Sequence, residues 1–359
     1  MLEEMLASRG LPELKTREEM KEILLREEYG YPTDVPYTWE VGEPRERERR
    51  FDCATCALSD VDMTIKTEYG SHTFTIHRLL HYDGKKRPFI IYMDFSQNIP
   101  SNYCFPELLS EQDVDVLAFH YESVTTDNND FTNGIAGILM PEGRKSPTAP
   151  GKLVLWAFAA SRVLDYAETL DCLIPGECAV LGHSRLGKTA LVAGMLDERF
   201  KYVCSNCSGC SGASLAKGSL GQTGEKGKGG GPGESYEVIN RVFPYWFCGN
   251  FAKYGEKNYS DEFDQHYLLA AIAPRYLMVI SADYDDWADP VSEQLCCAAA
   301  GGMWEKYGKR GFVHNDAILA AREVLNEGSV AYYRHSGHHF LSYHNWLQLI
   351  AFMKKNAAN

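Results

Sequence analysis

The sequence has no excess of positive charge. Its 36 Lys and Arg residues face 49 Asp and Glu residues, which gives a formal net charge of -13 at pH 7. Such a charge repels the phosphate backbone of nucleic acids, and no stripe of Lys and Arg offsets it locally. We therefore expect no nucleic-acid partner. The content of 45% hydrophobic and 24% charged residues is ordinary for a soluble globular protein and excludes disorder as the main state.

Long apolar runs are also missing from the chain. None is long enough to span a bilayer, so we expect no membrane partner. The first thirty residues are acidic and helix-patterned, and they lack the basic start and apolar run of a secretory leader. These features predict a cytoplasmic protein, or a secreted one if a leader has been removed. The sequence gives no indication of oligomeric state.

The cysteines do not resemble a disulfide framework, because there are eleven of them, an odd number. Two stretches have spacings that could bring thiolates to one metal, Cys204-x-x-Cys207-x-x-Cys210 and Cys53-x-x-Cys56. Neither stretch has an obvious fourth ligand. Reduced, buried thiols are the simpler interpretation, and we expect neither a metal nor an organic cofactor.

Hydrophobic patterns divide the chain into a short leading part and a long alternating part. Thr16 is a plausible N-cap for a helix over 16–28, with Glu19 three residues later. Alternating or apolar runs predict strands joined by hairpins within 60–95, and a further buried strand at 114–121. Residues 122–150 are polar and rich in Gly and Pro, which predicts a long loop of the kind that frames sites.

After that loop, helical and strand patterns alternate. Helices are predicted at 153–170, 188–200, 290–306 and 316–326, and strands at 177–182, around 202, at 275–281 and at 331–334. This order predicts a mostly parallel sheet with helices on both faces. The stretch 221–234 is rich in glycine and predicts a mobile loop. We expect one α/β domain over 1–359, with 1–58 as a peripheral helical or irregular extension.

The segment GHSRLGKT, residues 182–189, lies between a predicted strand and a predicted helix and has two incompatible functional interpretations. It matches the phosphate-binding pattern G-x-x-x-x-G-K-[ST] completely, in the strand–loop–helix context which that pattern requires. It also resembles a nucleophile elbow, which would lift Ser184 to the end of the sheet. The elbow match is imperfect, because the second glycine stands at 187 and Leu186 occupies its usual place. A glycine turn without chemistry is the third possibility.

Context favours the elbow. A phosphate-binding loop normally follows the first strand of its domain, whereas several strands precede this segment. Such a loop also needs a later strand that ends in a Mg²⁺-binding Asp, and no convincing apolar strand of that kind lies at the expected distance. An α/β hydrolase instead runs serine, acid, histidine in chain order. Here the strand at 275–281 leads into Asp283, Asp285, Asp286 and Asp289, and the last strand leads into His335, His338 and His339. These groups are expected at one edge of the sheet, where open α/β sheets bind their ligands.

The segments GHSRLGKTALVAGMLDERF, GESYEVINRVFPYWFCGNF, FDQHYLLAAIAPR, DDWADP and HSGHH resemble the glucuronoyl esterases of carbohydrate esterase family 15 over roughly residues 150–350. The resemblance implies the α/β-hydrolase fold, a three-layer sandwich around a mostly parallel sheet, and cleavage of esters of 4-O-methyl-glucuronate. It implies Ser184 as nucleophile, Arg185 at the oxyanion, His338 as base and Asp285 as acid. It also implies Lys188 and Trp287 as substrate-binding residues, and Glu234 and Glu237 as candidates for the same role.

One position departs from that family. Many members carry a catalytic Glu in an N-E-S-G-like setting after the strand that follows the nucleophile, and this chain has Cys207 there, in Asn206-Cys207-Ser208-Gly209. A neutral thiol cannot replace the carboxylate. The acid is therefore expected at Asp285, unless the triad is incomplete.

The residues themselves support the same chemistry. A serine hydroxyl needs a base, and a histidine can accept its proton at neutral pH when a carboxylate fixes its tautomer. Backbone N–H groups after Ser184 and the Arg185 guanidinium can stabilise the anionic intermediate. We therefore expect a serine carboxylic ester hydrolase acting on a small-molecule or oligosaccharide uronate ester. A carbohydrate acetyl esterase, a P-loop NTPase and a non-catalytic carbohydrate-binding relative remain alternatives.

Overall fold

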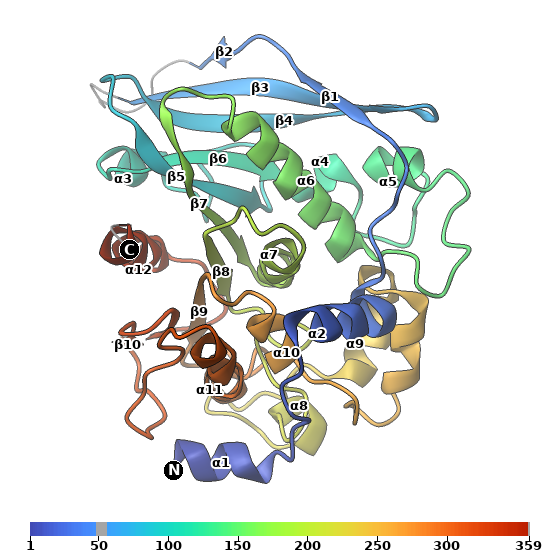
Figure 1. The fold of residues 1–359 in the computed structure, drawn as a ribbon, viewed down its shortest axis with the longest axis vertical. Helices are drawn as coiled ribbons and strands as arrows, with labels where there is room; N and C mark the ends of the chain where they lie inside the picture. The colour runs from blue at the N-terminus through green and yellow to red at the C-terminus, as the bar shows by residue number, and fades with distance from the viewer. Residues whose placement is uncertain (48–55, 358–359) are drawn as a thin grey trace.

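Eleven strands form one mixed sheet in the computed structural model, which describes residues 1–47 and 56–357 (Figure 1). The strands are β1 (Thr38–Val41), β2 (Arg45–Glu46), β3 (Cys56–Thr67), β4 (Gly70–His81), β5 (Arg87–Asp94), β6 (Asp115–His120), β7 (Leu173–His183), β8 (Tyr202–Asn206), β9 (Tyr276–Ala282), β10 (Glu323–Leu325) and β11 (Val330–His335).

The order across the sheet is β1-β3-β4-β6-β5-β7-β8-β9-β11-β10, with β2 paired to β3. From β6 to β11 every neighbouring pair is parallel, and the antiparallel pairs lie at the two ends. The chain forms β5 first, then places β6 between β5 and β4, and then crosses to the other side of β5 to form β7. The carboxyl ends of β7, β8, β9 and β11 therefore meet at one edge of the sheet.

The helices complete the chain. They are α1 (Leu2–Ser8), α2 (Arg17–Leu24), α3 (Pro106–Ser110), α4 (Tyr121–Val124), α5 (Gly134–Leu139), α6 (Lys152–Ala167), α7 (Arg185–Leu196), α8 (Leu220–Thr223), α9 (Tyr236–Val242), α10 (His266–Ala270), α11 (Pro290–Lys306) and α12 (Tyr343–Asn356). The other helical segments are the π-helical η1 (Leu25–Tyr29) and the 3-10 helices η2 (Pro244–Trp246) and η3 (Gly249–Tyr254).

Two hydrophobic cores cover the two faces of the sheet, because successive side chains of a strand point to opposite faces. In β5, Ile91 belongs to the core that includes residues of α6, α7 and α11, whereas Ile90 and Tyr92 belong to the core beneath α12. Figure 1 shows α6 and α7 on one side of the strands and α12 with α3 on the other. The molecule is therefore the three-layer α/β-hydrolase sandwich that the sequence predicted.

Several sequence-based expectations need correction. The strand that follows β4 does not pair with it, because β4 pairs with β6 and β5 lies between β6 and β7. The predicted helix at 316–326 is wrong, since this segment holds β10. The first 58 residues are not only helical or irregular, because β1 and β2 add to the sheet edge through β3. The capping box at Thr16 and Glu19 is confirmed at the start of α2.

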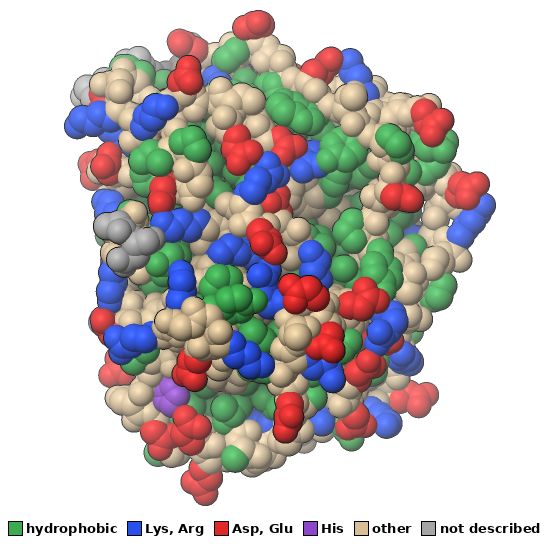
Figure 2. All heavy atoms as spheres, in the orientation of Figure 1, with side chains coloured by type: hydrophobic (Ala, Val, Ile, Leu, Met, Phe, Trp, Pro, Cys, Tyr) green, Lys and Arg blue, Asp and Glu red, His purple; other side chains and the backbone are tan. Residues whose placement is uncertain are grey.

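The surface seen in Figure 2 mixes acidic and basic side chains, and no uninterrupted basic stripe crosses that face. Within residues 1–47 and 56–357, no helix is both long and apolar enough to cross a bilayer. The spacing Cys53-x-x-Cys56 cannot be assessed, because Cys53 lies outside the described residues.

Candidate active site

Four parallel neighbours in the sheet supply the candidate site. Ser184 follows β7 directly, Cys207 follows β8, Asp285 lies three residues after β9 and His339 lies four residues after β11. Parallel strands end at the same edge, so residues far apart in the sequence come together there.

Ser184 has the backbone of a nucleophile elbow. Its φ of 58° and ψ of -128° lie in a region that residues other than glycine adopt only under strain. Its N–H donates to the carbonyl of Asn206, 2.9 Å away on β8. Gly182 must lack a side chain, because a Cβ there would lie 1.9 Å from the carbonyl oxygen of Leu186. The tight turn therefore holds Ser184 between the strand and the helix. It does so although the second glycine, Gly187, stands one position later than in the usual elbow pattern.

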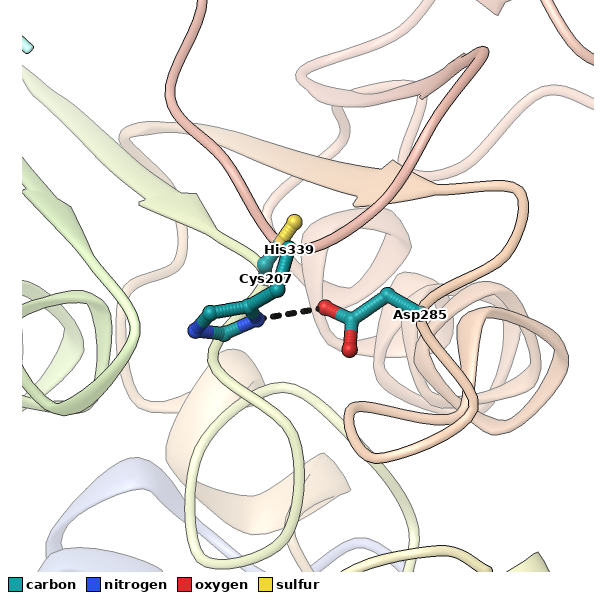
Figure 3. A group of neighbouring side chains, drawn as sticks. All are labelled: Cys207, Asp285 and His339. Carbon is teal, nitrogen blue, oxygen red and sulfur yellow. Dashed lines mark hydrogen bonds and ion pairs between the residues drawn. The ribbon is translucent and has the colours of Figure 1, made fainter. Parts of the chain in front are cut away.

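Asp285 holds a histidine, and that histidine is His339. The Nδ1 of His339 lies 2.6 Å from an Asp285 carboxylate oxygen (Figure 3). The His339 ring also packs against the ring of His183, the residue before Ser184, with 4.5 Å between centroids. The structure thus brings His339, and not the predicted His338, to Asp285, because the turn after Gly337 places His338 against the exposed ring of Tyr284.

The other aspartates of the turn that follows β9, residues 283–289, have structural partners. Asp283 pairs with Arg334 at 2.9 Å and with Lys228. Asp289 caps α11, where its side chain accepts from the N–H of Ser292. Among the four aspartates of the turn, Asp285 is therefore the one whose carboxylate reaches a histidine.

Asp286 binds the glycine-rich segment 221–234 to the turn at residues 283–289, called here the acid turn. Its two carboxylate oxygens accept from the backbone N–H groups of Gly229 at 2.9 Å and Gly231 at 2.8 Å. A Cβ on Gly227 would lie 2.1 Å from the same carboxylate, so the close approach requires glycine. The segment that the sequence predicted to be mobile is thus held against the acid turn.

Cys207 lies beside the Asp285–His339 pair (Figure 3). Its sulfur, an Asp285 oxygen and a His339 nitrogen all lie within 4.8 Å of one another. Cys207 is buried, and burial, together with the nearby negative charge of Asp285, raises the pKa of its thiol well above the usual range. The thiol therefore stays protonated at neutral pH and cannot act as the second carboxylate expected at this position.

Arg185 is anchored by a residue that the sequence did not single out. Its guanidinium forms an ion pair with Asp127, whose side chain is only 6% exposed. The indole N–H of Trp246 donates to the same carboxylate at 2.7 Å, and the Arg185 guanidinium lies 4.9 Å from the centre of the Trp246 ring. Buried partners on two sides fix the cation beside the nucleophile.

Lys188 is fully committed to protein acceptors. Its ammonium group donates to the carbonyls of Ser208 and Cys210, each at 2.6 Å, and to Glu234 at 2.7 Å. An ammonium group has three donors, so all of them are used. The predicted direct contact of Lys188 with substrate hydroxyls is not supported by this geometry. The same geometry contradicts a P-loop role, because the P-loop lysine must reach phosphates.

The remaining predicted binding residues separate into two groups. Trp287 is 40% exposed, and its carbonyl accepts from the N–H of Glu234 at 2.9 Å, so both lie next to the acid turn. Glu237 is different. Its carboxylate pairs with Arg241 in the same helix, and its N–H donates to Asn258, so the structure does not bring it to the other site residues.

Glu293 forms buried contacts with the segments after β8 and at the end of β9. It is fully buried, accepts from the N–H of Gly209 at 2.9 Å and lies 2.5 Å from the hydroxyl of Ser281. Burial, with the charges of Asp285 and Asp289 adding to it, raises the pKa of Glu293 to about 8. The carboxyl group is therefore protonated at neutral pH, which spares the site a further negative charge.

An apolar groove of about 760 Å³ is lined in part by Phe340, the residue that follows His339 in the chain. Phe340, Ser342 and Tyr343 line one wall, and the segment that contains α3 supplies the opposite wall. Phe340 and Tyr343 are each 39% exposed.

Sequence reasoning missed Asp127 and Trp246, and it named His339 in the histidine cluster but chose His338 as the base. Asp127 lies in the polar loop that was expected to frame the site, but nothing in its local pattern distinguishes it from Asp130. Trp246 lies within the stretch that carried the family resemblance. The choice between His338 and His339 depends on one turn that follows a glycine.

Comparisons with known proteins agree with this architecture. Residues 62–308 match the model of the family described as glucuronyl esterase, fungi. A carbohydrate esterase from an unidentified prokaryote is 34% identical over 66% of this chain and 52% of its own length. The 4-O-methyl-glucuronoyl methylesterase of Podospora anserina is 31% identical over 45% of this chain and 34% of its own length. These alignments thus span about half or less of the relatives.

Solved structures are similar over more of their length. The glucuronoyl esterase from Solibacter usitatus superposes with a TM-score of 0.79 and 26% identity, covering 95% of this chain and 92% of that one. A glucuronoyl esterase from Teredinibacter turnerae gives a TM-score of 0.80 at 24% identity, with 95% and 84% covered. The second likeness concerns the fold alone. Since the family model matches well over half of the residues, the chain belongs to the glucuronyl esterase family.

Proposed function

We propose that the protein is a serine carboxylic ester hydrolase in which Ser184, His339 and Asp285 form the catalytic triad. The observation that carries the proposal is the 2.6 Å contact between Asp285 and Nδ1 of His339, at the same sheet edge as the strained backbone of Ser184. The carboxylate keeps a proton on Nδ1, so Nε2 is available as a base.

The reaction follows from these roles. His339 takes the hydroxyl proton of Ser184 as Oγ bonds to the ester carbonyl carbon. The same proton then passes to the leaving oxygen as the bond between the acyl carbon and that oxygen breaks. A water molecule, deprotonated by His339, releases the acid from Ser184 and restores the enzyme.

The negative charge of each tetrahedral intermediate needs donors that are in place beforehand. The first N–H groups of α7 have no acceptor within the helix. The Arg185 guanidinium, held by Asp127 and Trp246, adds a fixed positive charge. Together they support stabilisation of an oxyanion next to Ser184.

For the acyl group we propose a glucuronate, or 4-O-methyl-glucuronate, in a small-molecule or oligosaccharide ester. The support is family membership, the names of the relatives and the exposed Trp287 ring beside Asp285 and Glu234, which offers a face for a sugar ring. An acetyl esterase acting on carbohydrate is the alternative within the same chemistry. The cytoplasmic location expected from the sequence stays a prediction.

Two measurements test the proposal. A fluorophosphonate probe should label Ser184 in the intact protein and should not label Ser184→Ala. The purified protein should then hydrolyse methyl and benzyl glucuronate faster than an acetyl ester of comparable size. The absence of both labelling and hydrolysis of any ester would favour a non-catalytic carbohydrate-binding relative, and faster acetyl release would assign the protein to the acetyl esterases.

A further inference from the structure

Four potential metal ligands lie close together around the Asp285–His339 pair of the proposed triad. Cys207, Asp285 and His339 place a sulfur, an oxygen and a nitrogen within 4.8 Å of one another. His335 adds a fourth donor, because its Nε2 lies 3.8 Å from the sulfur of Cys207. The four residues come from the ends of three adjacent strands, β8, β9 and β11.

His335 already has the arrangement of a metal-binding histidine. Its Nδ1 lies 3.0 Å from the carbonyl oxygen of Ser336, so Nδ1 carries the proton and Nε2 presents a lone pair toward Cys207. A backbone carbonyl on the far nitrogen commonly orients histidine ligands of zinc.

From this convergence we infer that Cys207, Asp285, His335 and His339 form a binding site for a thiophilic divalent cation, with Zn²⁺ as the best match. Thiolate, imidazole and carboxylate are the ligands that Zn²⁺ takes in proteins, in tetrahedral geometry. Bonds of about 2.0–2.3 Å place two such ligands roughly 3.3–3.8 Å apart, so the present cluster needs only small side-chain movements.

Charge also suits a dication. Binding converts the Cys207 thiol to a thiolate and releases one proton to water, and this thiolate with the Asp285 carboxylate neutralises Zn²⁺. The metal itself makes up the cost of deprotonating the buried thiol, since a coordinating thiol is deprotonated outright. Cys207 and Asp285 are buried, whereas the His339 side chain is 37% exposed, so a cation can enter past His339.

Such binding has a consequence for the proposed activity, which rests on the function proposed above. Coordination through Nδ1 breaks the contact of His339 with Asp285 and leaves the ring proton on Nε2. His339 can then no longer accept the proton of Ser184. Zn²⁺ therefore acts as a reversible inhibitor that competes with the triad for its own histidine.

The test uses metal-free full-length protein titrated with Co²⁺, a spectroscopic substitute for Zn²⁺. We expect the thiolate-to-cobalt charge-transfer band and the visible bands of four-coordinate cobalt, both removed by added Zn²⁺. Cys207→Ala should lose the charge-transfer band and weaken Zn²⁺ binding by at least about tenfold in calorimetry. The matched control is Cys204→Ala, which removes an equally buried thiol three residues earlier on β8 and should keep the band.

Cys207→Ser replaces Cys207→Ala if circular dichroism shows that the alanine variant does not fold. A band that persists without the Cys207 thiol, or no thiolate band at saturating Co²⁺, overturns the site. The binding measurements do not use ester hydrolysis, so they stand even if the proposed function fails. If hydrolysis is found, Zn²⁺ should inhibit the wild type and the Cys204→Ala variant, with EDTA restoring the rate.

Discussion

Nδ1 of His339 lies 2.6 Å from the carboxylate of Asp285, while the neighbouring His338 packs 5.7 Å, centroid to centroid, from the ring of Tyr284. Two adjacent histidines thus have different surroundings. His339 is oriented by a buried carboxylate and lies against His183, whereas His338 packs on an exposed aromatic ring. This difference gives a matched pair of variants.

We expect His339→Ala to lower kcat on a glucuronate ester by at least about three orders of magnitude, because the base is lost. His338→Ala should reduce kcat less than tenfold. Steady-state kinetics on both variants, with melting curves to confirm folding, make the comparison. A large loss in His338→Ala together with near wild-type activity in His339→Ala would reverse the assignment.

Asp285→Asn should keep the fold but lower kcat by roughly three to four orders of magnitude, because the imidazole loses the carboxylate that fixes its tautomer. Combining it with Cys207→Glu should recover part of the rate, since the Cys207 sulfur is within 4.8 Å of the His339 nitrogen. Asp286→Asn is the control, and its loss should appear mainly in stability, because its carboxylate holds backbone N–H groups of the glycine-rich segment. Equal rates for Asp285→Asn and wild type would place the acid elsewhere.

The Lys188–Glu234 pair predicts a stability effect. Lys188→Met should destabilise the protein by about 3–5 kcal/mol, because it leaves Glu234 charged or forces its protonation in a buried site. The double variant Lys188→Met with Glu234→Gln should recover a substantial part of that loss, since no buried charge remains. Urea unfolding of the two single variants and the double variant measures the coupling. Additive losses would mean that the two side chains do not interact.

Glu293 predicts a pH dependence of stability. Its carboxyl pKa is raised from the ordinary value of 4.5 to about 8 in the fold, so the folded state holds a proton that the unfolded state loses. Its stabilising contribution is complete below pH 4.5 and disappears as the pH rises through about 8. Between pH 6 and pH 9 the unfolding free energy should fall more in the wild type than in Glu293→Gln. The difference should be at least ~1 kcal/mol, since a shift of one pKa unit corresponds to about 1.4 kcal/mol. Parallel curves for both proteins in chemical denaturation would contradict the assignment.

The groove beside Phe340 predicts a preference for apolar alcohols. His339 must return its proton to the leaving oxygen, so the leaving group lies on the side of His339, and the next residue, Phe340, lines the groove. Tyr343→Ala should raise KM several-fold for benzyl glucuronate and leave KM for methyl glucuronate unchanged. Tyr69→Ala removes a similarly exposed ring from the β3–β4 turn and serves as control. An equal effect on both esters would exclude the groove as the alcohol site.

Much of this arrangement follows from the sequence, because hydrophobic patterns show where strands end, although they did not give the position of β5 between β6 and β7. The patterns at 177–182, 275–281 and 331–334 predicted that Ser184, the aspartates and the histidines would meet. Local patterns could not separate His338 from His339, since the choice depends on the turn after Gly337. They also could not show that Lys188 points into the protein toward Glu234, because the two residues are 46 positions apart. Asp127 belongs to a loop whose course depends on tertiary contacts.

The attachment of the glycine-rich segment to Asp286 has a consequence for protein engineering. Since its backbone N–H groups and the Asp286 carboxylate satisfy each other, neither the segment nor the acid turn is a self-sufficient module. Moving the segment alone into a relative would leave its N–H groups without their acceptor and would loosen the turn that carries Asp285. Chimaeras that exchange substrate preference should therefore take residues 219–292 as one cassette, with crossover points before Ser219 and after Ser292.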